Sequence, residues 1–585
     1  MMKVNPILAI DAYKFGHMSM HPKVIDYVYG NLTPRSTKYF DRLVPEGFKD
    51  GKLVNFGMQM AIQDINEAFT FNFFNRDIEE IIPEFMETAA PFIGENKEAK
   101  DILEANVRSL HKLGYLPLRI KALPEGTITK AQVPSLTIIN TKPGFGWLPN
   151  YLETFLSQST WKTVTVATMA KLYNKIFKHY SELTCDNDLH VPFQGHDFSV
   201  RGMSSTEDSI KSGIAALTQS WGSDSVHAAY SAKEHYNFTN DIPLAFSVPA
   251  TEHSIMCLGS ALTSEEDTFR RLLTQYNTGI ISIVSDTYDY WNTITKIASN
   301  LKDDILARQP DSNGLCKTVF RPDSGNPVDV ICGTGANATT IGLNYYKEGS
   351  IDSWKEAVAN DISETFNEEL VSTEPIFAIE LNYSFEGDIY KVTYEPDLNR
   401  YDKTYYYVDN YGSNLSKCKF TKLESTPQQK GSIEILWDTF GGTINNKGYK
   451  VLNSKVGLIY GESITPQRAV DIFTRLAAKG FASSNIVFGI GSYAFNYSTR
   501  DTLGYTFKAT CAIDNTGKII PIQKTVVTDT TKKSAAGLVH VSDDLVVTDN
   551  VTLEMEATGA LKVIFEDGNC YFEHDFAKIR ERASK

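Results

Sequence analysis

The chain has 585 residues, of which 42% are hydrophobic and 22% charged, which is ordinary for a globular protein with more than one domain. Its 57 basic and 71 acidic residues give a formal net charge of −14, which disfavours binding to nucleic acid or to an anionic membrane. No signal-peptide pattern opens the chain and no apolar run reaches about 18 residues, so neither secretion nor a membrane span is expected.

Short strand-like runs lie near both ends of the chain, at 118–122, 127–129, 135–140, 517–521 and 561–565. Such apolar and β-branched runs between turn residues are typical of strands. We expect the two ends, 1–150 and 505–585, to pair as one β-containing domain. The segment between them, 151–504, opens with apolar residues at helical spacing from Val166 to Tyr180, which predict an amphipathic helix.

Five apolar runs in the middle segment each lead into polar or ionisable residues. The runs are 244–248 before His253, 281–284 before Asp286, 318–320 before Arg321, 458–459 before Gly461, and 486–488 before Gly489. Parallel strands deliver active-site groups at their carboxyl ends in this way. Separations of 33 residues from His253 to Asp286, 37 from Asp286 to Asp323 and 29 from Glu462 to Gly491 fit strand–helix repeats. The fold class is therefore predicted as α/β, an irregular (β/α) barrel over 151–504.

One separation is too long for a single repeat, because 139 residues lie between Asp323 and Glu462. We expect an inserted α+β segment at 334–430, after which 433–439 resumes the helix. Trp354, Val358, Ile362, Phe366 and Leu370 form one apolar stripe of a helix in it. The runs 390–394 and 404–408 resemble a hairpin. A surface addition or oligomer contact is favoured over a regulatory domain.

The seven cysteines are scattered, with no Cys-x-x-Cys and no His-Glu-x-x-His pattern in the chain. This usage indicates reduced, structural thiols in a cytoplasmic protein and argues against a zinc site.

The groups that follow the apolar runs suit a phosphorylated substrate. Arg321 offers a planar fork for phosphate oxygens. Asp323 could accept from ribose hydroxyls or hold Mg²⁺ through its water shell, so the metal ligands stay undetermined. Gly489 to Ser492 would let backbone N–H groups approach a phosphate, although such glycine turns are often merely structural. An isolated histidine is more often a core residue than a catalyst, but Asp286 could orient His253.

The segment from His196 to Gly202 places Phe198 three residues before Arg201. The structural interpretation is a core phenylalanine beside a surface arginine. The functional one is a ring that stacks on a flat base and a cation that binds its phosphorylated partner.

Seven motifs then appear in order along nearly the whole chain outside the insertion. They are Asp11–Lys14, His196–Gly202, Gly222–Ser225, Ser247–Ser254, Ser282–Asp286 with Tyr288-Asp289, Arg321–Pro327 and Thr499–Asp501. Together they resemble the nicotinamide phosphoribosyltransferases, a type II phosphoribosyltransferase family.

The resemblance implies that nicotinamide lies between Phe198 of one subunit and Tyr13 of the other in a homodimer with shared active sites. Asp224 would accept from the carboxamide NH₂ and repel the carboxylate of nicotinate, and Ser247, Val248 and Ser282 would line the same pocket. The phosphoribosyl and phosphate contacts would come from Arg201, Arg321, Asp323, Gly461, Glu462, Gly491, Ser492, Arg500, Lys508, Lys524, Lys532 and Lys533.

The reaction implied is pentosyl transfer in NAD biosynthesis: the pyridine nitrogen displaces pyrophosphate from 5-phosphoribosyl 1-pyrophosphate and gives nicotinamide mononucleotide. Mg²⁺ would stabilise the leaving pyrophosphate. ATP would serve as a coupling substrate by phosphorylating His253, with Asp286 on the other ring nitrogen. Two positions depart from the family: Glu462 and Ser463 replace the Asp-Gly of a Gly-Asp-Gly motif, and Ser492 lies in what is otherwise a run of glycines.

Two other functions remain open at this point. The sister activity on nicotinate is opposed by the charge of Asp224. A non-catalytic nicotinamide or nucleotide sensor on the same fold is opposed by the presence of His253, Asp286, Arg321 and Asp323 together.

Overall fold

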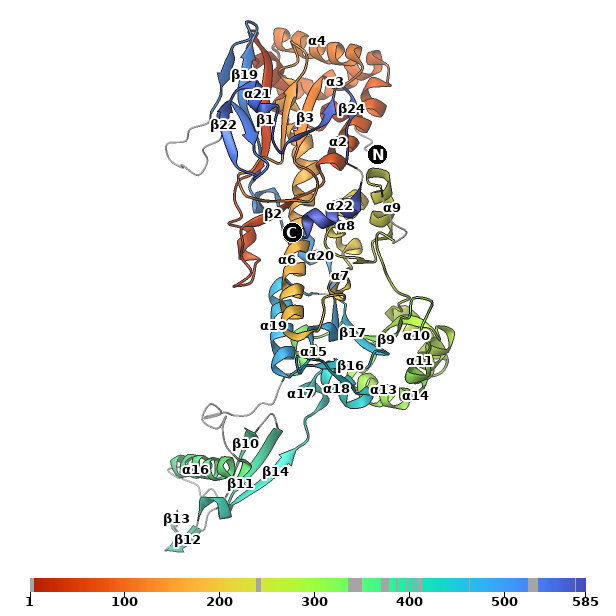
Figure 1. Cartoon of the computed structure of the whole chain (residues 1–585), viewed down its shortest axis with the longest axis vertical. Helices are drawn as coiled ribbons and strands as arrows, with labels where there is room; N and C mark the ends of the chain where they lie inside the picture. The colour runs from red at the N-terminus through yellow and green to blue at the C-terminus, as the bar shows by residue number, and fades with distance from the viewer. Residues whose placement is uncertain are drawn as a thin grey trace. The chain divides into compact units, whose positions relative to one another are not determined.

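The structure is a computed structural model of the chain. It describes residues 5–237, 243–334, 350–369, 378–385, 388–395, 398–401, 404–407, 413–461, 463–523, 535–573 and 575–585. The fold divides into two units (Figure 1). Unit 1 contains Met1–Val248, Gly461–Phe473 and Ala482–Lys585, and unit 2 contains Pro249–Tyr460 and Thr474–Phe481.

Unit 1 is built on a seven-stranded antiparallel sheet in the order β20-β19-β1-β5-β3-β23-β24. The strands are Ile519–Pro521, Tyr505–Asp514, Ile25–Pro34, Leu136–Asn140, Leu118–Ala122, Lys562–Glu566 and Asn569–Cys570 in that order. Leu32 and Leu118 of the N-terminal segment and Phe507 and Phe565 of the C-terminal segment are buried in this sheet, so both chain ends contribute apolar residues to its core. The predicted pairing of the N- and C-terminal segments in one β-containing domain is confirmed.

Two long helices, α3 (Ile78–Ile93) and α4 (Lys97–Leu113), pack against each other beside this sheet (Figure 1). Asn96 begins α4 by accepting a hydrogen bond from the backbone N–H of Ala99, at 3.0 Å. Gly114 ends it in the left-handed conformation with φ +79°. The capping residues thus set the length of the helix.

The 32-residue helix α6 (Glu153–Thr184) is longer than the helix predicted over 166–180. Thr168 Oγ1 accepts from the backbone N–H of Val54 in β2 (Lys52–Asn55), at 3.0 Å. Thr163 Oγ1 donates to Phe56 O, at 2.9 Å. These contacts bring α6 into unit 1 with both chain ends, so the units of the structure do not divide at the domain limit of 150 that the sequence suggested.

Parallel strands occur in both units, which confirms the α/β class. In unit 1, β6 (Gly195–Asp197) pairs with β7 (Gly222–Ser223) and with β18 (Ile486–Ile490). In unit 2, β9 (Cys316–Arg321) pairs with β8 (Gly279–Val284) and with β17 (Val456–Tyr460).

The strand expected at 244–248 does not form. Only an isolated bridge joins Phe246 to Gly222. Pro243 and Pro249 bound the run and have no N–H to donate to a neighbouring strand, which explains why pairing stops after one residue.

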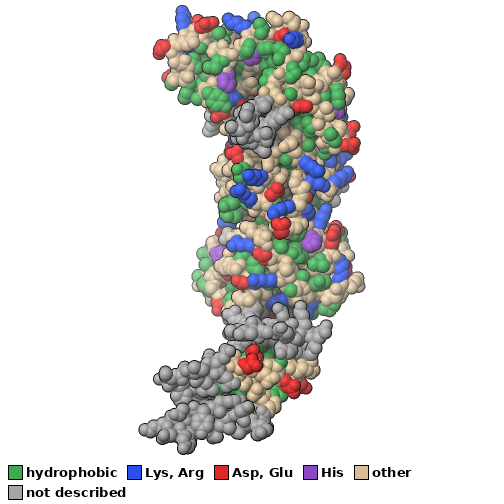
Figure 2. Space-filling model, turned by 90° about the vertical axis from the view of Figure 1, so that its left-hand side faces the viewer, with side chains coloured by type: hydrophobic (Ala, Val, Ile, Leu, Met, Phe, Trp, Pro, Cys, Tyr) green, Lys and Arg blue, Asp and Glu red, His purple; other side chains and the backbone are tan. Residues whose placement is uncertain are grey.

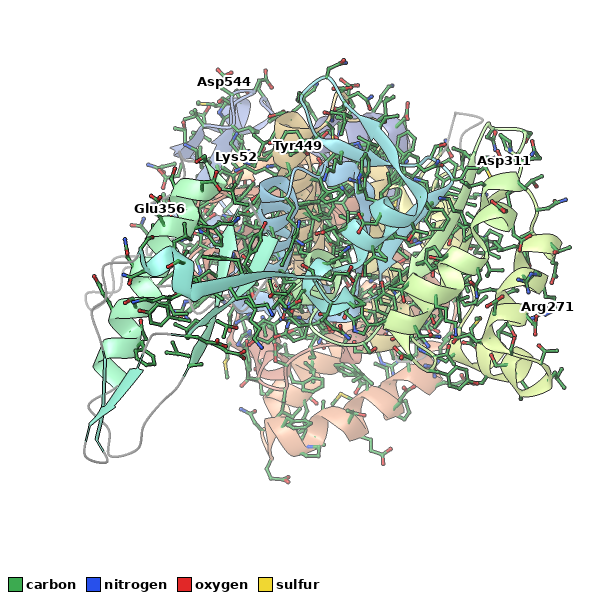
Figure 3. The ribbon with its side chains drawn as sticks, turned by 90° about the horizontal axis from the view of Figure 1, so that it is seen from below. Lys52, Arg271, Asp311, Glu356, Tyr449 and Asp544 are labelled. Carbon is green, nitrogen blue, oxygen red and sulfur yellow. The ribbon has the colours of Figure 1, made fainter. Side chains whose placement is uncertain are left out.

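The insertion forms an α+β layer of its own inside unit 2. Helix α16 (Ile351–Glu369) buries Trp354, Val358, Ile362 and Phe366 against a three-stranded sheet, whereas Glu356 on the other side of the helix is exposed (Figure 3). Leu370, the last residue of the predicted stripe, lies outside the described residues. The sheet has the order β10 (Ile379–Phe385), β11 (Asp388–Tyr394) and β14 (Cys418–Leu423).

The predicted hairpin between 390–394 and 404–408 is wrong. Strand β11 pairs with β10 and β14, and β13 (Thr404–Tyr407) pairs with β12 (Leu398–Tyr401). The sequence reading overlooked the alternation of apolar and polar residues over β10, which provides the nearer partner for β11.

The two ends of the insertion meet in space. The backbone N–H of Thr334 donates to Gln428 O, at 3.0 Å. Gly333 and Gly431 have φ values of +81° and +80°, and a Cβ on either would clash with the backbone of the other end. Helix α18 (Ser432–Phe440) follows at once.

The remaining described elements are connections around these layers. The helices are α1 (Lys14–Met20), α2 (Met58–Phe69), α5 (Leu148–Tyr151), α7 (Val191–Gln194), α8 (Thr206–Ala216), α9 (Val226–His235), α10 (His253–Leu262), α11 (Glu265–Gln275), α12 (Tyr290–Asn292), α13 (Ala298–Asn300), α14 (Lys302–Ala307), α15 (Pro327–Cys332), α17 (Pro427–Lys430), α19 (Pro466–Ala478), α20 (Ser492–Asn496), α21 (Leu553–Glu556) and α22 (Phe576–Ala583). The strands are β4 (Thr127–Lys130), β15 (Gly442–Ile444), β16 (Lys450–Leu452), β21 (Leu538–Val541) and β22 (Val547–Val551). Among the described helices, none is both long and apolar enough to cross a membrane.

The start of α2 is held by the buried side chain of Glu125. Its carboxylate accepts from the backbone N–H groups of Gly57 and Gln59, at 2.6 and 2.8 Å. Burial raises the pKa of Glu125 to about 7, although these N–H groups and the charge of Arg582 act to lower it. Because the folded pKa lies above the unfolded value, the stabilisation is complete below about pH 4.3 and is lost as the pH rises through about 7.

We predict that Glu125→Gln abolishes this pH dependence, because the amide does not titrate. The free energy of unfolding of the native protein should fall by up to about 3 kcal/mol between pH 4.5 and 7.5 from this group, and the variant should lack that fall. Urea unfolding at a series of pH values measures both. Glu46→Gln, at a fully exposed carboxylate, is the control that should keep the fall. An identical fall in the Glu125 variant would contradict the assignment.

Candidate functional site

In unit 2, polar groups converge where the parallel strands β8 and β9 end. Asp286, two residues after β8, is almost completely buried, with 4% of its side chain exposed. Its Oδ1 lies 3.2 Å from His253 Nε2. Its Oδ2 accepts from the backbone N–H of Asp323, at 3.0 Å, and from Ser324 Oγ, at 2.7 Å. One carboxylate therefore holds both the histidine and the loop after β9.

His253 is the first residue of α10 and half of its side chain is exposed. A carboxylate only accepts hydrogen bonds, so Nε2 carries the proton in this pair. The neutral ring then has its lone pair on Nδ1, which is the nitrogen that could act as a nucleophile.

Arg321 is fixed at the end of β9 by the neighbouring segment. Its Nη2 donates to Thr251 O, at 2.6 Å, and its backbone N–H donates to Ser285 Oγ, at 3.2 Å. Its Nε lies 3.8 Å from Asp323 Oδ2. Thr251 is in turn fixed because its Oγ1 accepts from the N–H of Val284, at 2.9 Å. The structure thus brings His253, Asp286, Arg321 and Asp323 together, as the sequence predicted.

Ser282 lies within β8 and is 4% exposed. Its Oγ has no hydrogen-bond partner among the described residues. A buried hydroxyl of this kind is available to a ligand or an ordered water.

In unit 1, the ring of Phe198 follows β6 directly. The backbone N–H of Phe198 donates to Ile490 O in β18, at 3.0 Å. A Cβ at Gly489 would lie 2.5 Å from the Phe198 ring and 2.5 Å from Gly461 O. Gly489 is therefore required by the close approach of Phe198 and Gly461, whereas a Cβ at Gly491 would meet nothing within 4 Å.

Arg201 lies exposed in the 3-10 turn Val200–Gly202, next to the short helix α20. Asn496 Nδ2 donates to Gly202 O, at 2.7 Å. A Cβ at Gly202 would clash with the Ser492 side chain. Ser492 thus occupies space that Gly202 leaves open, which explains how a serine fits where the family has glycine.

Asp224 follows β7 and lies near the same ring of Phe198. Its Oδ1 accepts from His196 Nε2, at 2.9 Å, and from Ser247 Oγ, at 2.5 Å. The His196 ring packs on Phe198 with a centroid distance of 4.9 Å. Val248 is half-buried next to Ser247. The structure brings Phe198, Asp224 and Ser247 together, as predicted.

Tyr13 is 61% exposed and lies before α1. Its ring packs on His17, at 5.2 Å between centroids. Burial, and then the charges of Glu153 and Asp11, raise the pKa of Tyr13, so the phenol stays neutral. Within the described part of a single chain, the rings of Tyr13 and Phe198 make no contact with each other.

Lys and Arg side chains are interspersed with Asp and Glu side chains on the face drawn in Figure 2, despite the net charge of −14. Lys508 in β19 lines a groove of about 1040 Å³ with Arg35, Lys52 and Lys130, three cations that the sequence reading missed. Arg500 is half-exposed and pairs with Asp501, at 2.9 Å. The predicted contacts Glu462, Lys524, Lys532 and Lys533 lie outside the described residues.

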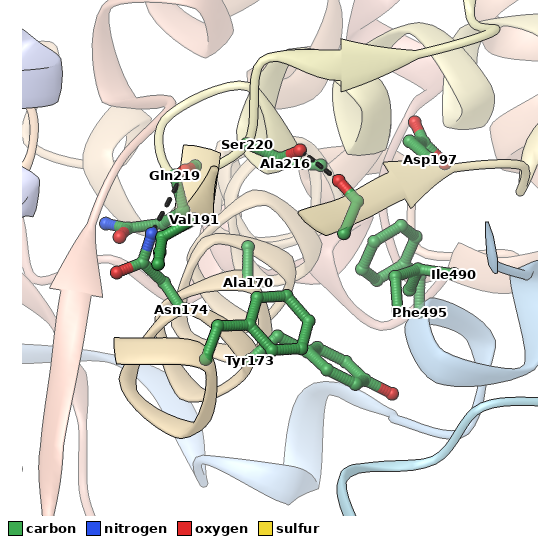
Figure 4. A pocket seen from close by; sticks show the side chains of 12 residues that line it. Ala170, Tyr173, Asn174, Val191, Asp197, Ala216, Gln219, Ser220, Ile490 and Phe495 are labelled. Atoms are coloured by element: carbon green, nitrogen blue, oxygen red, sulfur yellow. Dashed lines mark hydrogen bonds between the residues drawn. The ribbon is translucent and has the colours of Figure 1, made fainter. Parts of the chain in front are cut away.

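A second cavity in unit 1 is too small for a substrate. It has a volume of about 30 Å³ and lies between α6, α7, α8 and β6, with Asp197 in its wall (Figure 4). This volume corresponds to about one water molecule. Burial raises the pKa of Asp197, which is consistent with a structural role for this carboxyl.

Three residues of these clusters were missed or left without a role by the sequence reading. Thr251 and Ser324 lie in the motifs Ser247–Ser254 and Arg321–Pro327, but they received no role because their contacts depend on how β8 and β9 are placed. His196 belongs to a motif, but its contact with Asp224 depends on the pairing of β6 with β7.

Comparison with known proteins gives one family. The model of the nicotinate phosphoribosyltransferase (NAPRTase) family matches residues 193–392 and 416–568. Nicotinamide phosphoribosyltransferase of Acinetobacter baylyi is 39% identical, over 100% of this chain and 98% of that protein. The proteins with the same name from Mycoplasma pneumoniae and Mycoplasma genitalium are 29% and 27% identical, each over 91% of this chain and 94% of their own length.

Ser463, beside Gly461, has a strained backbone. Its φ of +63° lies in the left-handed region, where a side chain costs about 1–2 kcal/mol relative to glycine. Its carbonyl oxygen accepts from Arg468 Nη1, at 2.6 Å, which holds the conformation in place.

We predict that Ser463→Gly raises the free energy of unfolding by up to about 1 kcal/mol, because it removes this strain. Chemical denaturation measures the change. The reverse substitution, Gly517→Ser, is the matched control: its φ is +84° and nothing lies within 4 Å of the added Cβ, so it should lower stability by a similar amount. A destabilised Ser463→Gly protein would refute the strain.

Proposed function

The chain belongs to the nicotinate phosphoribosyltransferase family, and we propose that it transfers the phosphoribosyl group of 5-phosphoribosyl 1-pyrophosphate to nicotinamide in NAD biosynthesis. The observation that carries the choice of nicotinamide is the Asp224 carboxylate, held by Ser247 and His196 next to the Phe198 ring. A carboxylate accepts from the carboxamide NH₂ of nicotinamide and repels the carboxylate of nicotinate. The three relatives that are named for this activity support the same substrate.

The chemical step needs no general base, because the pyridine nitrogen carries no proton. Stacking on Phe198 orients the electron-poor ring, and the nitrogen then attacks the ribose C1 as its bond to pyrophosphate breaks. Arg321 supplies a fixed guanidinium for the phosphate oxygens. Asp323 is held two residues away by its backbone contact to Asp286, so that it can accept from the ribose hydroxyls. The transition state resembles an oxocarbenium ion, and basic groups that include Arg201, Arg500 and Lys508 stabilise the leaving anion.

Mg²⁺ fits this chain as a companion of pyrophosphate. Across the described residues, no group of three or more His, Cys, Asp or Glu side chains could hold a metal. Mg²⁺ in such enzymes needs only one or two carboxylates in addition to substrate phosphates, and Asp323, with 30% of its side chain exposed, would supply one. The ion would neutralise charge on the departing pyrophosphate.

The pairing of His253 with Asp286 suits a phosphorylated intermediate. Asp286 fixes the protonated Nε2, and the exposed ring presents its other nitrogen to an incoming phosphoryl group. We therefore assign to His253 the coupling of ATP hydrolysis to synthesis.

The exposure of Tyr13 supports a homodimer with shared sites. Tyr13 is exposed and contacts His17 rather than Phe198 in its own chain, which leaves its ring available to a second subunit. None of the seven cysteines forms a disulfide, as expected for a protein of the reducing cytoplasm, where we place the reaction.

Product analysis tests the function directly. The protein is incubated with 5-phosphoribosyl 1-pyrophosphate and Mg²⁺, with nicotinamide or nicotinate, and with or without ATP. Formation of nicotinamide mononucleotide and pyrophosphate is expected, with nicotinate a poor substrate. Preferential use of nicotinate would assign the sister activity, and product from neither base would leave only a binding role.

We predict that Asp224→Asn lowers the ratio of kcat/KM for nicotinamide to that for nicotinate by at least about tenfold, because the repelling charge is lost. Steady-state kinetics with both bases measure the ratio. Glu356→Gln, at an exposed carboxylate of α16, should leave it unchanged. A ratio unaltered by Asp224→Asn would rule out charge as the basis of selection.

We predict that His253→Ala abolishes the stimulation of synthesis by ATP and leaves a slow rate that does not depend on ATP. The reason is that alanine has no nitrogen to accept the phosphoryl group. The rate of product formation with and without ATP measures the effect. His540→Ala, in β21 of unit 1, should keep the stimulation, and full stimulation in His253→Ala would contradict the role.

A further inference from the structure

The carboxylate of Asp224 is held by two donors on the same oxygen. His196 Nε2 and Ser247 Oγ lie 2.9 and 2.5 Å from Oδ1. The Asp224 side chain is 45% exposed, whereas that of His196 is only 12% exposed. The exposed group is thus fixed by a largely buried one, so the orientation of Asp224 depends on its neighbours.

His196 is itself fixed more firmly than a surface histidine. It lies in β6, where it pairs with Gly222 of β7. A Cβ at Gly222 would lie 2.7 Å from His196 Nδ1, so the ring occupies space that only glycine leaves. The backbone N–H of Asp224 donates to Asp197 O, at 3.0 Å. The histidine and the aspartate are therefore held in register by adjacent strands.

The chemistry of the pair decides the proton position. Ionised Asp224 accepts and does not donate, so Nε2 of His196 carries the hydrogen. An imidazole that donates through Nε2 orients the carboxylate. His196 also acts sterically, because its ring packs on the ring of Phe198, at 4.9 Å between centroids and an interplanar angle of 57°.

We propose that His196 is the positioning residue of the base site: it orients Asp224 through Nε2–H and supports the ring of Phe198, and it thereby sets the selection of amide over acid. The inference rests on the proposed function. His196 acts through its two neighbours and touches no reacting atom. Ser247 is the lesser partner, because its hydroxyl is on an exposed residue and can rotate.

Three substitutions separate the hydrogen bond that His196 donates to Asp224 from the packing of its ring on Phe198. His196→Phe keeps a ring beside Phe198 but has no donor. His196→Gln places an amide N–H near the position of Nε2 but has no ring. Ser247→Ala removes the second donor and leaves the histidine in place. Circular dichroism and thermal unfolding establish that each protein is folded.

The measurements are kcat and KM for nicotinamide and for 5-phosphoribosyl 1-pyrophosphate, together with the amide-to-acid ratio of kcat/KM. His196→Phe should raise the KM for nicotinamide about tenfold and lower the ratio, with kcat and the KM for the sugar phosphate changed less than about threefold. His196→Gln should recover most of the ratio, and Ser247→Ala should change it less than His196→Phe does. A fall in kcat alone, with KM and ratio unchanged, would overturn the proposal.

The decisive comparison is made in the Asp224→Asn background. Since His196 acts on selection through Asp224, adding His196→Phe should not lower the amide-to-acid ratio further. A further fall of the same size as in the native background would show that the histidine acts independently and would overturn the inference. Native protein that does not use nicotinamide would refute the proposed function itself. Normal native kinetics with an unaffected His196→Phe variant would refute only the role of His196.

Discussion

The polar edge of unit 2 depends on one buried carboxylate. Asp286 accepts from His253 on one oxygen and from the loop after β9 on the other. A buried charge is costly unless all its lone pairs are used, so these partners are held as a group rather than singly. The arrangement gives His253 its tautomer and places Asp323 and Arg321 at the same strand ends. Without this carboxylate, His253, Asp323 and Ser324 would each lose a hydrogen bond that holds them in place.

The cluster around Phe198 in unit 1 follows a different constraint, that of close packing around glycine. Gly489 admits the Phe198 ring and Gly461, and Gly222 admits the His196 ring. Gly202 does the same for Ser492, so a departure from the family pattern at one position is accommodated at another. Here the position of a functional group is set by the absence of side chains beneath it.

Much of this architecture was predictable because its signals are local. Short runs rich in apolar residues identified β3, β8, β9 and β17, and the polar residues after β8 and β9 identified most of the unit 2 cluster. Strand β10 was missed although its apolar residues alternate with polar ones, and the wrong hairpin followed from that omission. The contact of His196 with Asp224 is not local: 28 residues separate them, and only the pairing of β6 with β7 brings them together. The motifs identify candidate residues in the sequence, whereas the order of the strands determines which of these residues are in contact.

The inserted layer joins the rest of unit 2 at a single place, because Gly333 and Gly431 at its two ends lie against each other. Both ends leave the host at practically one point, so the host backbone needs no adjustment to its presence. The entropic cost of carrying a longer or shorter appendage there grows only slowly with length. Evolution can therefore enlarge, replace or discard this layer while the catalytic scaffold stays as it is, and a protein engineer can use the same junction to graft a different module.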